Sequence, residues 1–235
     1  MTAFPVPARL DPPAAILWDF DGTLIDTEPT WVRVEQELLS GYGVDWTVEQ
    51  GAALSGTSWQ YATQKLIDAT GDGSLDLWDF YVQRYTRVAQ HLREAGDLPW
   101  RPGAEALLED LYRRRVPCGV VSQSPRELLD AGLERIKPGR LQVVVTGDDL
   151  AAGKPDPMGF LMAAARLGVR ASDCLVIEDS PAGCEAGRRA GAVVLGVPCM
   201  TPLDPGPRTI IQDTLVGLDT QSLARLWAGQ QGSNQ

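Results

Sequence analysis

An apolar run that ends at Trp18 is followed directly by residues whose types could take part in a reaction or bind an ion. They are Asp19, Asp21, Gly22 and Thr23. Because a strand places residues i and i+2 on the same face, the carboxylates of Asp19 and Asp21 can converge where the strand ends. Gly22 permits a tight turn in which main-chain N–H groups surround an anion. Two close carboxylates repel each other unless a cation lies between them or one holds a proton. The pattern predicts a divalent metal site, an acid–base pair, or both; an ordinary turn is the alternative.

The elements that must position these residues form an alternating pattern. Short apolar runs rich in Val, Ile and Leu predict strands buried on both faces of a parallel sheet, at residues 14–19, 116–122, 141–146, 174–177 and 192–197. Helical patterns lie between them, at residues 102–115, 125–136, 157–167 and 181–190. Alternating strands and helices predict an α/β fold with a doubly wound parallel sheet.

One segment, residues 30–95, interrupts the alternation with helical patterns and no convincing strand. Three apolar helical faces are expected there, containing Trp31, Val34 and Leu38, then Trp59, Leu66 and Ile67, then Leu77, Tyr81, Val88 and Leu92. We therefore expect a small helical domain inserted after the first strand. The predicted division is a sheet-containing core of residues 1–28 and 98–235 and an inserted helical domain of residues 29–97.

Composition narrows the classes of partner. The formal net charge of −10 argues against a nucleic-acid polymer and against an anionic membrane surface. The four cysteines include no CxxC pair, and His91 is the single histidine, which disfavours a zinc site. The N-terminal residues do not form a signal peptide, and no apolar run reaches the length of a membrane span. A cytoplasmic protein with free thiols is expected.

Polar residues follow four of the predicted strands, where ligands bind in such sheets. Besides Asp19 and Asp21, these are Ser122, Lys154 and the pair Glu178-Asp179. Each could alone be a helix cap or a solvated charge. Together, hard oxygen ligands predict Mg²⁺, and a lysine and a hydroxyl beside it predict a site for a phosphoryl group.

The motifs Asp19-Phe20-Asp21-Gly22-Thr23, Ser122, Lys154 and Glu178-Asp179 resemble those of the haloacid dehalogenase superfamily over essentially the whole chain. The runs at residues 26–29 and 178–183 look like the subgroup that includes β-phosphoglucomutase and phosphoglycolate phosphatase. The resemblance implies a Rossmann-like core with an inserted helical cap. It also implies a Mg²⁺-dependent phosphatase of a small phosphorylated metabolite.

The resemblance implies roles for the catalytic residues. Asp19 would attack phosphorus and form an aspartyl-phosphate, and Asp21 would protonate the leaving oxygen and then activate water. Lys154 is expected beside the reacting group as both a catalytic and a phosphate-binding residue.

The same resemblance implies the ligands of the metal and of the phosphate. Mg²⁺ would be held by the side chains of Asp19, Asp179 and Glu178 and by the carbonyl of Asp21. Phosphoryl oxygens would be bound by Ser122 and Lys154, and by N–H groups near Gly22 and Gln123.

Particular residues separate hydrolysis from the other reactions and roles of this superfamily. Dehalogenases and phosphonatases of the superfamily lack an aspartate at the position of Asp21. The phosphosugar mutases have a histidine and a basic pair where this chain has Trp31, Ser55 and Trp59, which favours hydrolysis and leaves mutase activity as the alternative. A non-catalytic phospho-ligand-binding protein is a second alternative. Degenerate members usually lose the nucleophile or a metal ligand, and this chain retains both.

Substrate choice is expected to lie in the cap. The loop around Gly56 and Thr57 joins two cap helices, and in the related fold this loop faces the catalytic aspartates. We expect Gly56, Thr57 and Trp59 to contact the substrate, with Trp59 forming a wall of the leaving-group pocket. Packing of the cap is the alternative role for Trp59.

Overall fold

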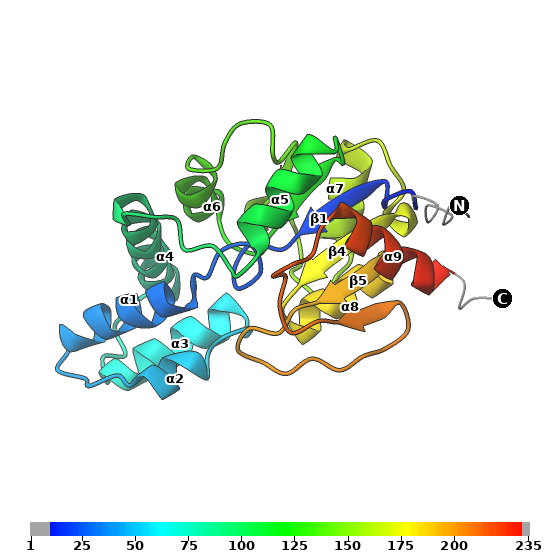
Figure 1. The fold of residues 1–235 in the computed structure, drawn as a ribbon. Helices are drawn as coiled ribbons and strands as arrows, with labels where there is room; N and C mark the ends of the chain where they lie inside the picture. The colour runs from blue at the N-terminus through cyan, green and yellow to red at the C-terminus, as the bar shows by residue number, and fades with distance from the viewer. Residues whose placement is uncertain (1–9, 232–235) are drawn as a thin grey trace, which may run out of the picture.

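The computed structural model describes residues 10–231. Six parallel strands form one sheet in the order β3-β2-β1-β4-β5-β6 (Figure 1). The strands are β1 (Ala15–Trp18), β2 (Cys118–Val121), β3 (Val143–Val145), β4 (Cys174–Glu178), β5 (Val193–Gly196) and β6 (Thr209–Ile211). The five predicted strands are confirmed. The sixth was missed because Thr209–Ile211 is only three residues long and its pattern is too short to detect.

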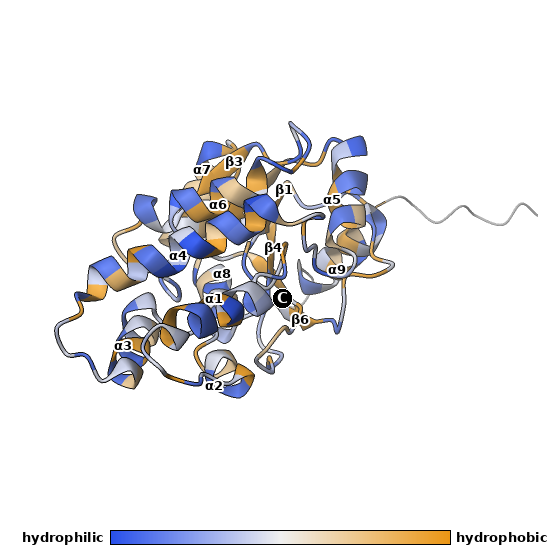
Figure 2. Ribbon diagram, turned by 90° about the vertical axis from the view of Figure 1, so that its left-hand side faces the viewer, coloured by the Kyte–Doolittle hydropathy of each residue, from blue (hydrophilic) through white to orange (hydrophobic). Residues whose placement is uncertain are grey.

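Helices cover both faces of the sheet, as a doubly wound fold requires. They are α5 (Ala104–Arg113), α6 (Arg126–Leu133), α7 (Met158–Arg166), α8 (Pro181–Arg189) and α9 (Thr220–Gln231). Ile16 and Trp18 of β1 pack in one buried apolar cluster together with residues of α5, α6 and α9, and Leu17 packs in a second cluster together with Phe160 of α7. Figure 2 shows apolar residues concentrated on the strands and polar residues on the outer helix faces. The predicted fold class is confirmed.

Between β1 and α5 the chain forms four helices and no strand, in agreement with the pattern of residues 30–95. They are α1 (Glu28–Ser40), α2 (Val48–Ala52), α3 (Trp59–Thr70) and α4 (Leu77–Glu94). Three were expected; α2 was missed because it is a five-residue helix that a capping box between Thr47 and Gln50 stabilises. In Figure 1 this group lies to one side of the sheet, with α4 packed against α6.

The two segments that connect the helical group to the sheet lie side by side. Ile25, after β1, forms an antiparallel bridge with Trp100, before α5, and the N–H of Asp26 donates to the carbonyl of Pro99 at 2.6 Å. The group is therefore entered and left at one place, which suits our proposal that residues 29–97 are a cap on the core of residues 1–28 and 98–235. Residues 1–9 and 232–235 of that core lie outside the described residues. No helix within residues 10–231 has the length and hydropathy that a membrane span needs.

Candidate active site

The strand order places the polar strand ends together. Because β1 pairs with both β2 and β4, the residues after these strands meet at one edge of the sheet. Asp19 follows β1, Ser122 follows β2, and Glu178 is the last residue of β4. All three side chains are buried. The sheet therefore brings the predicted residues from distant parts of the sequence to one site.

Lys154 links two of these carboxylates. Its Nζ lies 2.5 Å from Oε1 of Glu178, contacts Oδ1 of Asp19, and donates to the carbonyl of Val121 at 3.3 Å. The lysine side chain is 6% exposed. Burial lowers the pKa of Lys154, but the charges of Asp19 and Glu178 outweigh that effect and raise it above its ordinary value. Lys154 is therefore a fixed positive charge inside the site.

The three buried acids Asp19, Glu178 and Asp179 form a cluster in which one oxygen of each lies within 4.8 Å of the others. Burial raises the pKa of Asp19 to about 7, Lys154 acts against this rise, and the charges of Glu178 and Asp21 add to it. Burial and the charges of Glu178 and Asp19 raise the pKa of Asp179 to about 9. The ionised forms of these acids are therefore unfavourable unless a further cation binds beside them.

The residues present fit a divalent cation. Oδ2 of Asp19 is buried and has no hydrogen-bond partner within the described residues. Glu178 is oriented firmly, because its Oε2 accepts from the N–H groups of Asp179 and Ser180 at 2.9 Å each. A set of carboxylate oxygens with no thiol or imidazole is the donor set that Mg²⁺ prefers.

Two glycines make room for this cluster. A Cβ on Gly22 would lie 2.4 Å from Oδ2 of Asp179, and Gly22 has a φ of +79°. A Cβ on Gly183 would lie 1.7 Å from Oε1 of Glu178. Only glycine lets the backbone approach the acids this closely.

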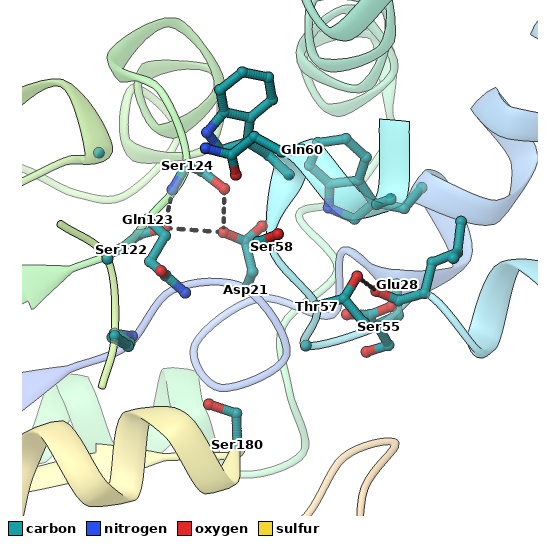
Figure 3. A pocket seen from close by; sticks show the side chains of 18 of the residues that line it. Asp21, Glu28, Ser55, Thr57, Ser58, Gln60, Ser122, Gln123, Ser124 and Ser180 are labelled. Carbon is teal, nitrogen blue, oxygen red and sulfur yellow. Dashed lines mark hydrogen bonds between the residues drawn. The ribbon is translucent and has the colours of Figure 1, made fainter. Parts of the chain in front are cut away.

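Asp21 is held by a separate set of hydroxyl groups. Its Oδ2 accepts from Ser122 at 3.0 Å and from Ser124 at 2.7 Å (Figure 3). Its Oδ1 accepts from Thr27 at 2.8 Å. Ser124 and Thr27 were not predicted as site residues. They lie 103 and 6 positions from Asp21, and hydroxyl contacts at such separations have no local sequence pattern. The environments of Asp19 and Asp21 therefore differ, as two carboxylates with different tasks require.

A cavity of about 450 Å³ opens above these residues, between the sheet edge and the helical group. On the side of the sheet edge, the cavity is lined by Asp19, Asp21, Ser122, Gln123, Lys154 and Asp179. On the side of the helical group, it is lined by Gly56, Thr57 and Trp59. Figure 3 shows how Asp21 and Ser124 lie relative to the cap residues Thr57 and Ser58. Gly22 and Glu178 are not among the residues that line the cavity; both are buried, Glu178 within the acidic cluster and Gly22 beside it. The structure thus brings the predicted core and cap residues together, and their individual roles stay proposals.

Trp59 begins α3 and lies in an aromatic cluster. Its ring is stacked on Tyr81, with centroids 4.5 Å apart and an angle of 23° between the planes, and it meets Trp78 edge-on at 5.7 Å. The preceding Ser58 caps α3 by accepting from the N–H of Tyr61 at 3.3 Å. Trp59 both packs on other aromatic rings and faces the cavity, so the contacts are compatible with either predicted role.

The cap also provides a cation that sequence reasoning missed. Arg84 of α4 lines the cavity, contacts Oε1 of Glu35, and lies over the ring of Trp31 at 4.5 Å from the centroid. Arg84 lies outside the positions of Trp31, Ser55 and Trp59, at which the sequence was compared with the mutases. Glu35 and Arg84 are 49 positions apart on two helices, so no local spacing could have indicated the pair.

Residues 16–197 match the family described as haloacid dehalogenase-like hydrolase, and the chain belongs to this family. This confirms the resemblance and the predicted hydrolase class.

Two relatives with named activities are phosphatases. Validoxylamine A 7'-phosphate phosphatase of Streptomyces hygroscopicus subsp. limoneus is 33% identical, over 77% of this chain and 84% of the relative. Fructose-1-phosphate phosphatase YqaB of Escherichia coli is 30% identical, over 76% of this chain and 93% of the relative.

Solved structures share the fold. The structure of CbbY from Rhodobacter sphaeroides in complex with phosphate has a TM-score of 0.78 and 25% identity, and the match covers 90% of this chain and 99% of that one. β-Phosphoglucomutase from Clostridium difficile has a TM-score of 0.74 over 92% of this chain and 97% of that one. Its identity of 20% shows a common fold alone.

Proposed function

We propose that this protein is a Mg²⁺-dependent phosphatase that hydrolyses a small phosphorylated metabolite through an aspartyl-phosphate on Asp19. The observation that carries the proposal is the arrangement around Asp19. One of its oxygens contacts Lys154, and the other is buried without a partner in the described structure. A carboxylate in this setting is oriented and free to attack on one side.

The reaction has two displacements. An oxygen of Asp19 forms a bond to phosphorus while the bond to the leaving oxygen breaks, and Asp21 gives that oxygen a proton. Asp21 then takes a proton from water as the water oxygen attacks phosphorus. The bond between phosphorus and Asp19 breaks, which releases phosphate and restores the carboxylate.

The chain's own groups position the phosphate. Lys154 supplies a buried positive charge, and Gln123 lines the cavity at the same sheet edge. The N–H of Gly22 donates to the carbonyl of Ile25 at 2.8 Å and the hydroxyl of Ser122 donates to Asp21, so each would have to leave that partner to bind a phosphoryl oxygen. The hydroxyls of Ser122, Ser124 and Thr27 orient Asp21. Positioning and charge stabilisation are the main sources of catalysis in phosphoryl transfer.

Mg²⁺ would be held by Asp19, Glu178 and Asp179 and by the backbone carbonyl of Asp21. When bound, it would neutralise charge between the nucleophile and the phosphate. The closeness of the three acids and the raised pKa of Asp179 support this assignment.

Hydrolysis is preferred over phosphosugar transfer. The cap loop that lines the cavity has no charged residue at positions 54–60, and the cavity-lining Arg84 is already paired with Glu35. A mutase would need cap groups that bind a second phosphate. The two sequence relatives described above are phosphatases, which supports the same choice, while the mutase among the solved structures is 20% identical and shares the fold alone.

We also propose a cytoplasmic setting. Cys118, Cys174, Cys184 and Cys199 are free thiols, and three of them are buried. Reduced cysteines are typical of that compartment.

Asp19→Asn tests the proposed function. Turnover of p-nitrophenyl phosphate and of a panel of phosphorylated metabolites would be measured with Mg²⁺ for both proteins. We expect wild-type turnover and nearly complete loss in Asp19→Asn, with the circular dichroism spectrum unchanged. A variant that keeps more than about a tenth of wild-type kcat, a barrier change under about 1.4 kcal/mol, would disprove the role of Asp19.

A further inference from the structure

The part of the cavity that faces away from the phosphate-binding edge has a distinct chemistry. Aromatic rings of Trp31, Trp59 and Tyr81 line it, together with the charged side chains of Arg84, Glu28 and Glu35. Rings of this kind pack against the apolar faces of a ligand, while the charged groups can bind its polar edge. The leaving group of the substrate must occupy this region.

Arg84 is the group in this region that is best prepared for a ligand. Its residue is 8% exposed, and its Nε is buried without a hydrogen-bond partner within the described part of the chain. A buried guanidinium with a free N–H is costly unless a bound group accepts from it. Trp31 below the guanidinium plane and Glu35 at its edge prevent it from turning away.

Glu35 removes the net charge of Arg84. Its Oε1 contacts the guanidinium, its Oε2 accepts from the indole N–H of Trp46 at 3.2 Å, and it is 1% exposed. Arginine keeps its proton in proteins, so Glu35 is its counter-charge in a buried site. Burial raises the pKa of Glu35, while Arg84 and the Trp46 N–H act against that rise.

Glu28 adds a further acidic group to the same region. It is partly buried at the start of α1, and Ser55 of the cap loop hydrogen-bonds to it. Together, Glu28, Glu35 and Arg84 bring two negative charges and one positive charge to the leaving-group side. A second phosphate or a carboxylate would be repelled there, whereas hydroxyl groups can both donate to the acids and accept from Nε of Arg84.

We propose that Arg84 and Glu35 act as one specificity-determining pair that selects an uncharged, polyhydroxylated leaving group and rejects a second anionic group. This inference rests on the proposed phosphatase function and names the substrate class of the same site. Arg84 binds hydroxyl oxygens, Glu35 cancels its charge, and Trp59 lies against the carbon skeleton.

Glu35→Gln tests the pair, because the amide retains an oxygen for Arg84 and removes only the negative charge. The readout is the ratio of kcat/KM for a hexose monophosphate to that for the corresponding hexose bisphosphate. We expect the wild type to prefer the monophosphate and Glu35→Gln to shift the ratio towards the bisphosphate by roughly tenfold or more.

Two further variants keep the outcome interpretable. Glu37→Gln removes a charge from the same helix at a side chain that pairs with Arg33 and His91 outside the cavity, and its ratio should equal that of the wild type. Glu28→Gln removes a cavity charge without touching Arg84. If Glu35→Gln fails to fold in a melting experiment, Glu28→Gln alone must shift the ratio in the same direction.

A wild type that prefers the bisphosphate would overturn the inference, as would an unchanged ratio in folded Glu35→Gln. Failure of the proposed function looks different, since no phosphate ester would then be hydrolysed, including p-nitrophenyl phosphate. In that case calorimetric binding of the hexose monophosphate and bisphosphate to wild type and Glu35→Gln gives the same comparison. Equal shifts in Glu35→Gln and Glu37→Gln would also refute the pair, because they would show a general charge effect.

Discussion

Nζ of Lys154 lies 2.5 Å from Oε1 of Glu178 and also contacts Oδ1 of Asp19, so one ammonium group joins carboxylates from β4 and from the end of β1. Glu178 is fully buried, and Lys154 forms ion pairs with it and with Asp19. Among residues 10–231, no oppositely charged group is in ion-pair contact with Asp179, the third acid of the cluster. The site therefore holds an excess of negative charge in a buried place. The pH and metal dependence of the protein follow from this excess.

The metal-free protein should become less stable as the pH rises from about 4 to about 9. Asp19 and Asp179 have a pKa raised from 3.8 to about 7 and about 9, so the folded state retains protons that the unfolded state has already lost. Their contribution is thus fully present below pH 3.8 and is lost through pH 7 and then pH 9. Melting temperatures in EDTA across this range check the trend. Asp179→Asn should flatten the decline above pH 7, and an equally steep decline in that variant would contradict the assignment.

Activity should require Mg²⁺. EDTA is expected to abolish turnover of p-nitrophenyl phosphate, and added Mg²⁺ should restore it. Mg²⁺ should also raise the melting temperature more at pH 8 than at pH 5, because protons compete for the acids at low pH. Ca²⁺ should inhibit, since its longer and more variable coordination spoils in-line geometry. Full activity of protein shown to be free of metal would refute the metal role of Glu178 and Asp179.

The protein should hydrolyse rather than isomerise a phosphosugar. β-Glucose 1-phosphate with a glucose bisphosphate primer is expected to give free phosphate at most, with little glucose 6-phosphate. The reason is that the cap loop lacks basic residues and Arg84 is paired with Glu35. Coupled detection of glucose 6-phosphate beside a phosphate assay separates the two reactions. Rapid formation of glucose 6-phosphate would establish the mutase alternative.

Trp59→Ala should raise KM for the physiological substrate and leave turnover of acetyl phosphate nearly unchanged, because Trp59 faces the leaving-group side of the cavity. The matched control is Trp78→Ala. Trp78 contacts Trp59 and Tyr81 in the same cluster but is 55% exposed. If Trp59 only packs the cap, Trp59→Ala should instead lose roughly 3–5 kcal/mol of stability and damage all substrates alike.

Much of the fold, and the part of the site at the edge of the sheet, could be predicted from the sequence by itself. Each strand of the sheet that carries a site residue is a continuous apolar run, and the run ends in the polar residue that the site uses, as at Asp19, Ser122 and Glu178. Local chain geometry and the rule that parallel strands end at one edge then bring these residues together. The tight turn at Gly22 could also be predicted from the local sequence, because glycine readily adopts the positive φ that such a turn needs.

The part of the site that the helical cap forms was decided only by the tertiary structure. Arg84 and Glu35 lie on α4 and α1, Trp46 lies between α1 and α2, and their contact depends on how these helices pack. From sequence alone, a charged residue in a helix is predicted to be exposed to solvent, and only the packing of another helix against it shows that it is buried. The same holds for Thr27 and Ser124, whose hydrogen bonds to Asp21 form only in the folded chain. The sequence by itself determined the reacting groups, and the packing of the cap determined what surrounds the leaving group.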